Sequence, residues 1–135
     1  MEIQLHSTRV NTLHFEASHA NNEDSSESPS LGIDFKSVYM PKDNKVFGIR
    51  FIVKTNQPNN FKLELDYVAW FRTLSEIDEE FKSSDFTKIN APAIAFPYLR
   101  AFVSTIILNS GFEPLVLPTI NFVKLHEHKK HKVKM

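Results

Sequence analysis

Apolar and polar residues alternate with a period of two along most of the first half of the chain, which is the pattern of half-buried β-strands. The alternation predicts four strands, over residues 2–17, 33–39, 46–55 and 61–74. In the first of these, Val10 departs from the odd parity of its apolar neighbours, which indicates a β-bulge or a bend.

Turn-forming residues separate the last three strands. Residues 41–44 read Pro-Lys-Asp-Asn and residues 57–60 read Gln-Pro-Asn-Asn, which favours short turns. Neighbouring strands are therefore expected to pair antiparallel, since parallel pairs need long crossovers. Residues 19–30 contain a single small apolar residue and predict a mobile polar loop.

The period changes after residue 74, and the second half of the chain indicates helices. Residues 76–86 predict a short helix or turn. Residues 90–92 resemble a helix entrance, but Pro97 indicates that the continuous long helix starts near there, and Gly111 is expected to end it. Its apolar residues follow helical spacing: Ala95, Leu99, Phe102, Val103, Ile106 and Ile107. Residues 112–122 predict an extended connector, and a short final helix is expected from Val123. The order predicts an α+β fold, in which a four-stranded antiparallel sheet precedes a long helix and a short C-terminal helix.

The apolar arc of the long helix is wide, so this helix must be covered on more than one side. One small sheet leaves surplus apolar surface, and oligomerisation is the expected way to bury it.

The chain has 135 residues, 41% of them hydrophobic and 24% charged, which fits one domain with a real core. No apolar run approaches the ~20 residues of a membrane helix, and the N-terminus lacks the pattern of a secretion signal. A cytoplasmic protein without membrane insertion is therefore expected.

The formal net charge is zero, but the charges are unevenly distributed. Five lysines and one acid fall in residues 124–134, so the end is basic and the rest is acidic. The expected organisation is a domain over residues 1–123 and a basic His/Lys-rich tail over residues 124–135. The favoured interpretation is that this tail is solvated and that the protein does not bind nucleic acid. A salt-sensitive contact of the tail with nucleic acid or a membrane surface is the alternative from another class.

Catalytic and metal-binding chemistry finds little support. The absence of cysteine excludes disulfides, thiolate metal sites and cysteine nucleophiles, and three glycines provide no Gly-rich phosphate loop. His128 and His131 share a helix face, but neighbouring lysines would repel a divalent ion, so no structural metal site is expected. The acids between Glu76 and Glu80 are adjacent in sequence and are typical of a solvated face. No nucleophile, base and oxyanion stabiliser occur together, so the protein is predicted not to be an enzyme and to need no cofactor.

The aromatic residues of the predicted strands are mostly expected in the core. Trp70 differs, because it shares the parity of the polar residues Glu64, Asp66 and Arg72, which indicates a groove or an interface. Glu64 and Asp66 lie on one face of a strand, and such a like-charged pair needs solvent or a basic partner.

Four ordered stretches resemble the SecB family of export chaperones. Residues 90–100 read Asn-Ala-Pro-Ala-Ile-Ala-Phe-Pro-Tyr-Leu-Arg, similar to the opening of the family's long helix. Residues 111–122 resemble its Gly, Pro, Leu, Pro and Asn-Phe connector, residues 15–17 its Phe-Glu-Ala, and residues 64–71 its fourth strand.

The resemblance implies a dimer of dimers that holds unfolded polypeptides without ATP and passes them to the SecA motor. The expected oligomer interface comprises Tyr98, Leu99, Phe102, Val103 and Ile106. The expected client-binding groove comprises Phe61, Leu63, Tyr67, Trp70 and Phe71. Grooves of this kind bind extended apolar segments, and several subunits add avidity.

In the family the motor docks on acidic residues of the exposed sheet face, which gives Glu16, Glu64 and Asp66 as expected docking residues. A further acidic position is Thr12 here, and the basic end replaces an acidic tail. These departures motivate an alternative, a SecB-like chaperone dedicated to one partner such as the antitoxin of a toxin–antitoxin system.

Overall fold

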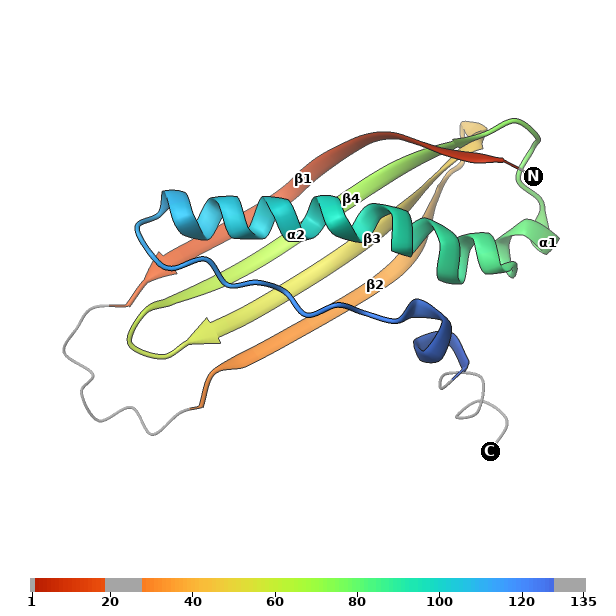
Figure 1. The fold of residues 1–135 in the computed structure, drawn as a ribbon. Helices are drawn as coiled ribbons and strands as arrows, with labels where there is room; N and C mark the ends of the chain where they lie inside the picture. The colour runs from red at the N-terminus through yellow and green to blue at the C-terminus, as the bar shows by residue number, and fades with distance from the viewer. Residues whose placement is uncertain (1, 19–27, 128–135) are drawn as a thin grey trace.

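Four antiparallel strands followed by helices form the fold, which confirms the predicted α+β class (Figure 1). The computed structural model describes residues 2–18 and 28–127. The elements are β1 (Ile3–Ala17), β2 (Ser30–Met40), β3 (Asp43–Gln57), β4 (Phe61–Thr73), α1 (Glu79–Lys82), the π-helical η1 (Phe86–Asn90) and α2 (Ala91–Asn109). A last helical segment covers residues 122–127, and the strand order is β1-β4-β3-β2. This segment crosses the expected domain boundary at residue 124, while most of the predicted tail lies outside the described residues.

The irregular parity of β1 comes from two bulges. The register with β4 shifts once between Leu5 and Ser7 and again between Val10 and Thr12. Each shift exchanges odd and even positions, so Val10 pairs with Tyr67 on the same side of the sheet as Leu5 and Leu13. The predicted bulge is confirmed.

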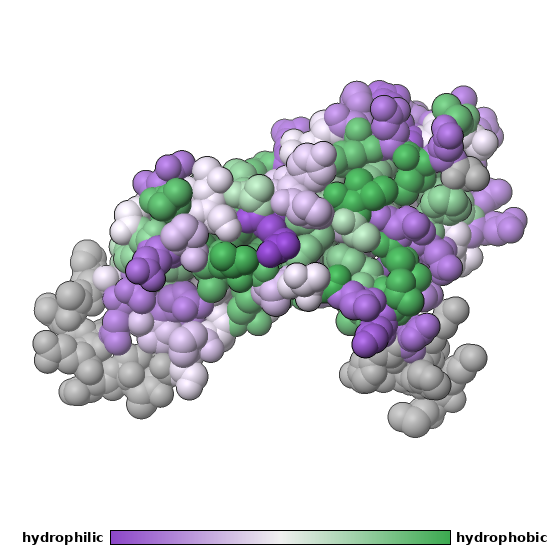
Figure 2. Space-filling view, viewed as in Figure 1, coloured by the Kyte–Doolittle hydropathy of each residue, from purple (hydrophilic) through white to green (hydrophobic). Residues whose placement is uncertain are grey.

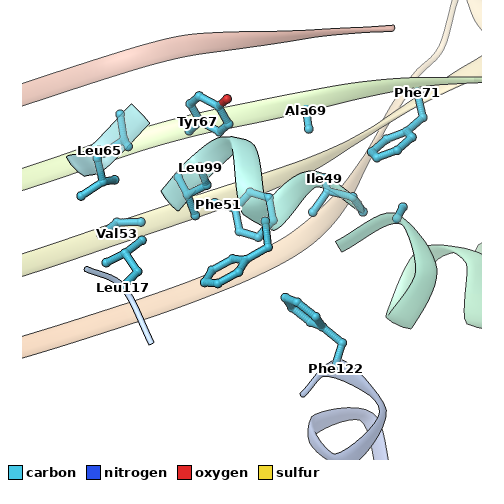
Figure 3. Packing of buried hydrophobic residues seen from close by; sticks show 14 of the residues in the cluster. Ile49, Phe51, Val53, Leu65, Tyr67, Ala69, Phe71, Leu99, Leu117 and Phe122 are labelled. Carbon is cyan, nitrogen blue, oxygen red and sulfur yellow. The ribbon is translucent and has the colours of Figure 1, made fainter. Parts of the chain in front are cut away.

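The core lies between one face of the sheet and the segments that cross it. Figure 1 shows α2 crossing this face, with the C-terminal segment running back over it. Phe51 and Val53 of β3 and Leu65 of β4 are buried here, and so is Leu99 of α2 (Figure 3). Phe122 closes the core beyond them; its ring centroid lies 5.4 Å from that of Phe35 on β2 and 5.7 Å from that of Phe96 on α2.

The long helix starts at Ala91, which confirms the helix entrance at residues 90–92, whereas the prediction that the continuous helix starts near Pro97 was wrong. Asn90 already has helical backbone angles because η1 leads directly into α2. Pro97 has no N–H to donate to the carbonyl of Ala93. Both residues lie on the exposed side of the helix, so water can reach that carbonyl.

The predicted helix end at Gly111 is confirmed. Gly111 has a φ of 94°, which side chains disfavour, and its N–H donates to the carbonyl of Leu108 at 3.1 Å. The N–H of Phe112 donates to the carbonyl of Ile107 at 3.2 Å, which completes a Schellman motif. The chain then runs extended to Asn121, whose side chain accepts a hydrogen bond from the N–H of Lys124 at the start of the last helical segment.

Contrary to the expectation of no membrane-length segment, Phe86–Asn109 is long and apolar enough to cross a membrane by length and composition. Leu99, Val103 and Ile107 of this segment are fully buried inside the molecule. A helix that covers the core of a soluble sheet protein has the same pattern, with one buried side and one exposed side.

Candidate binding surfaces

The outward side of α2 forms an apolar stripe, defined by Ile94, Tyr98, Ala101, Thr105 and Leu108. These exposed residues recur every three or four positions, so they share one side of the helix. Tyr98 is 52% exposed and Leu108 is 58% exposed. Arg100 is the one charged residue of α2. Figure 2, which views this side of the molecule, shows several hydrophobic patches among the polar residues.

The predicted oligomer-interface residues divide between two sides of α2. Leu99 and Val103 are fully buried, so these two are unavailable to a second copy in this structure. Tyr98 is exposed, while Phe102 and Ile106 are half-buried. The helical period explains the division, since residues one apart point about 100° from each other.

The side chain of Arg100 has an incomplete set of hydrogen bonds. Its Nε is buried, and no acceptor for it occurs among the described residues. A buried donor without an acceptor is costly, so this atom favours an acceptor supplied from outside the described part of the chain.

A cleft lies at the end of the sheet where β3 turns into β4. Its volume is about 320 Å³, and it is lined by Gln57, Asn60, Phe61, Phe112, Glu113, Pro114 and Leu115. The rings of Phe61 and Phe112 lie 5.2 Å apart, and Phe15 stacks on Phe61 at 5.3 Å. Val116, the next residue of the connector, is 65% exposed. Gln57, Asn60 and Glu113 supply a polar part of the lining and Phe61 is only 3% exposed, so Phe112, Leu115 and Val116 are the apolar groups open to an extended segment.

The five predicted groove residues do not share one surface. Phe61, Leu63, Tyr67 and Phe71 are at most 4% exposed, under the helix-covered side, whereas Trp70 points to the opposite face of the sheet. Phe61 alone of the five lines the cleft.

Sequence reasoning missed Phe112 and Leu115 as cleft residues. The available signal was the apolar, proline-containing connector, which is too irregular to bury all of its own side chains.

Trp70 lies across Gly48 on the outer face, the side of the sheet that α2 leaves uncovered. A Cβ on Gly48 would lie 2.9 Å from Cε3 and Cζ3 of Trp70 and 2.8 Å from Cγ2 of Val38. Glycine therefore provides the space for the indole ring. Among the described residues, none accepts a hydrogen bond from the indole Nε1.

Asp66, one of the three predicted docking residues, already accepts hydrogen bonds from neighbouring side chains on the outer face. Arg50 Nε donates to its Oδ1 at 2.9 Å, and Asn11 Nδ2, at the second bulge of β1, donates to the same oxygen at 3.3 Å. The hydrogen bonds from Arg50 hold the pKa of Asp66 below its ordinary value, against the opposing effect of burial. This carboxylate is thus already paired.

Glu16 and Glu64 remain on the outer face beside basic neighbours. Glu16 has a 69% exposed side chain, lies 3.5 Å from His14 Nε2 and is opposite Lys62 in register. Glu64 lies between His14 on β1 and Lys54 on β3. The two acids are accessible, but positive side chains flank both.

The described residues contain no group of three or more histidine, cysteine, aspartate or glutamate side chains that could hold a metal ion. His126 Nε2 lies 3.8 Å from an Asp85 oxygen. The predicted histidine pair, His128 and His131, lies outside the described residues.

Comparison with known proteins shows what class of protein carries this fold. The family model "Preprotein translocase subunit SecB" matches residues 1–133. The protein-export protein SecB of Roseobacter denitrificans is 39% identical over 77 residues, which cover 57% of this chain and 45% of that protein. The SecB of Magnetococcus marinus is 29% identical over 122 residues, which cover 86% and 76% of the two chains.

Among solved structures, a Mycobacterium tuberculosis SecB-like chaperone in complex with a ChAD peptide from the HigA1 antitoxin has the same fold. It matches with a TM-score of 0.64 at 16% identity, over 87% of this chain and 89% of that chain.

The chain belongs to the SecB family, a family of chaperones. It matches about half the length of several of its curated relatives.

Proposed function

We propose that this chain is a cytoplasmic, ATP-independent holdase that binds unfolded preproteins and delivers them to the SecA motor. The observation that carries the proposal is the exposed apolar surface on the helix-covered side, where Tyr98, Leu108 and Val116 are all more than half exposed. A monomer gains nothing from exposing such residues together, so they indicate contact with other chains. Membership of the SecB family supports a chaperone as the class of protein.

The client segment is assigned to the cleft and the connector beside it. Phe112 and Leu115 form the apolar part of the cleft over the buried Phe61, and Val116 extends this apolar part along the chain. Dispersion and desolvation bind aromatic and aliphatic client residues there without sequence choice, and no nucleotide is needed.

Light scattering of an aggregating, chemically unfolded client tests this assignment. The wild-type protein is expected to suppress the scattering, and Val116→Asp is expected to weaken the suppression several-fold, because a carboxylate must lose its hydration to contact an apolar client. Thr119→Asp is the matched control, since it places the same charge on an exposed residue of the same connector. A wild-type protein that leaves the scattering unchanged contradicts the holdase proposal, and equal losses in both variants contradict the connector site.

The stripe on α2 is assigned to a second copy of the chain, within a dimer of dimers. Tyr98, with the half-buried Phe102 and Ile106, would lie in this contact. An acceptor from the second copy would also satisfy Arg100 Nε. In this arrangement the stripe contacts the second copy, and the cleft and the connector remain free to bind the client.

Delivery to SecA is assigned to Glu16 and Glu64, with Asp66 contributing less because Arg50 already pairs with it. Isothermal titration with purified SecA is expected to show binding that Glu16→Lys and Glu64→Lys each weaken. Glu79→Lys is the control, since Glu79 lies in α1, outside the sheet. An absence of SecA binding removes this step while leaving the holdase proposal intact.

A chaperone dedicated to one partner is the second candidate. The observation that favours it is the mixed charge of the predicted docking face, where Lys62 and Lys54 lie opposite Glu16 and Glu64. The structural relative bound to an antitoxin peptide shares this fold. Selective co-purification with one small protein, together with absent SecA binding, favours this candidate.

A further inference from the structure

We propose that the half of the outer face around Trp70 binds an acidic peptide segment that carries an apolar side chain. This surface, the Trp70 patch, comprises Arg9, Lys36, Val38, Trp70 and Arg72. It lies on the opposite face of the sheet from the client cleft, and it differs in charge from the acidic docking residues. The proposal therefore goes beyond the holdase function and adds a second kind of partner.

The strand register gathers basic side chains around Trp70. Arg9 on β1 is opposite Val68, Val68 is opposite Arg50, and Arg50 is opposite Lys36 on β2. Arg72 follows Trp70 at the next outward position of β4. Arg9, Lys36 and Arg72 are exposed, and Arg50 is held by Asp66.

The charge of the outer face is divided along the strands. The described outward positions from the row of Val68 to that of Arg72 are Gln4, Ser7, Arg9, Lys36, Val38, Val46, Gly48, Arg50, Val68, Trp70 and Arg72, and none is a carboxylate. The nearest outward acid on β4, Asp66, is paired with Arg50. Glu64 is six residues from Trp70 along β4, about 20 Å at the usual rise of a strand. The patch is therefore positive, while the exposed acids Asp34, Glu16 and Glu64 lie on the other half, with Asp34 two positions from Lys36 on β2.

The centre of the patch is apolar and holds an available donor. The indole of Trp70 is half-buried and occupies the space of a missing side chain at Gly48, and Val68 packs beneath this surface at 2% exposure. The indole Nε1 has no acceptor among the described residues. An apolar ligand residue can pack on the ring while carboxylates on either side accept hydrogen bonds from the indole and from the guanidinium groups of Arg9 and Arg72.

Charge complementarity favours an acidic peptide over a nucleic acid. A basic surface with an aromatic ring can also bind single-stranded nucleic acid, but such sites stack successive bases on several rings. Trp70 is the sole Phe, Tyr or Trp at the outward positions of the described strands. A longer phosphate chain would also approach Asp34, Glu16 and Glu64 on the same face. A short peptide can place its few carboxylates on the basic half alone.

Tryptophan fluorescence tests the proposal directly, because Trp70 is the single tryptophan of the whole chain. The probe is a peptide of about ten residues made of Asp, Glu and Leu, long enough in extended form to cross the four strands. A saturable change in emission is expected, with an affinity that falls as salt is added. The double variant Arg9→Glu/Arg72→Glu is expected to bind at least about tenfold more weakly.

The matched control is Lys54→Glu/Lys62→Glu, which changes the net charge equally on the other half of the same face. This control is expected to bind the probe nearly as the wild type does. Equal loss in both double variants, no saturable change, or equal binding of a peptide with Lys in place of the acids overturns the proposal. Tighter binding of an oligonucleotide of similar length overturns it in favour of a nucleic-acid partner. The client-aggregation assay on the same variants separates this outcome from a failure of the holdase function.

Discussion

At the scale of single residues, the ion pair between Arg50 and Asp66 stabilises the middle of the outer face. The hydrogen bonds from Arg50 lower the pKa of Asp66 in the folded protein. The pair therefore stabilises the fold fully above the unfolded pKa of about 3.9, and this contribution is lost as the pH falls through the lower folded value.

Asp66→Asn is expected to lower the free energy of unfolding at neutral pH by about 1 kcal/mol, since Arg50 stays partly exposed. The variant should also lose less stability than the wild type on acidification below pH about 4, because the titrating group is gone. Urea unfolding at a series of pH values measures both effects. Glu64→Gln, on the same strand and face, is the control, and an equal flattening of its pH dependence contradicts the assignment.

Gly48 carries a second prediction at this scale. Gly48→Ala places a methyl group 2.9 Å from the indole of Trp70, so the ring must move. We expect a red-shifted tryptophan emission and a loss of about 1–3 kcal/mol in unfolding free energy. Gly32→Ala is the matched control on the same face, since its nearest contact is 4.0 Å away. Unchanged emission in Gly48→Ala would mean that the ring does not lie over this glycine.

At the scale of elements, the strands could be predicted because period-two alternation reports burial of one face. The same logic detected the irregularity of Val10, although the sequence did not reveal that two bulges, before and after Val10, produce it. The helix entrance at residues 90–92 was detected, but the continuous helix was placed too late because Pro97 normally ends or begins a helix. What permits this proline is its placement on the exposed side, which is a property of the packed molecule.

Pro97 itself leads to a prediction for α2. Pro97→Ala restores an N–H that can donate to the carbonyl of Ala93, so the isolated subunit should gain about 1–3 kcal/mol in unfolding free energy. Pro114→Ala is the control, because Pro114 lies in the extended connector, where no helical hydrogen bond is regained. Its substitution should be neutral or slightly destabilising through the freer unfolded chain. Chemical denaturation at low protein concentration measures both, and a loss of stability in Pro97→Ala contradicts this account of α2.

The candidate site was less predictable than the strands, for a related reason. Parity correctly separated Trp70 from Phe71, but it does not say which face of the sheet a helix will cover. The strand pattern placed most of these aromatic residues in the core, whereas the resemblance to SecB assigned Phe61, Leu63 and Phe71 to a groove, and all three are buried. Likewise, the pairing of Glu16 with Lys62 depends on the register between β1 and β4, which residues far apart in the sequence determine.

At the scale of the whole molecule, the two faces of the sheet differ in chemistry. The helix-covered side exposes aliphatic and aromatic residues, and the outer face exposes charges around a single indole. A chaperone needs both, because apolar contacts hold unfolded chains without sequence choice, whereas charged contacts select a partner. The proposed client site and the proposed partner site would therefore lie on opposite faces of the sheet.

The mass of the oligomer tests whether the stripe on α2 contacts a second copy of the chain. If the stripe on α2 is buried between copies, Tyr98→Glu/Leu108→Glu should shift the sedimentation mass towards smaller species, because two carboxylates would lose hydration in an apolar contact. Ser7→Glu/Thr12→Glu adds the same charge at exposed positions of β1 on the outer face and should leave the mass unchanged. Because Tyr98 and Leu108 are already exposed, neither substitution removes core packing, and circular dichroism should stay that of the wild type. An unchanged mass would assign the stripe to clients instead of copies, and the same double variant should then fail to suppress client aggregation.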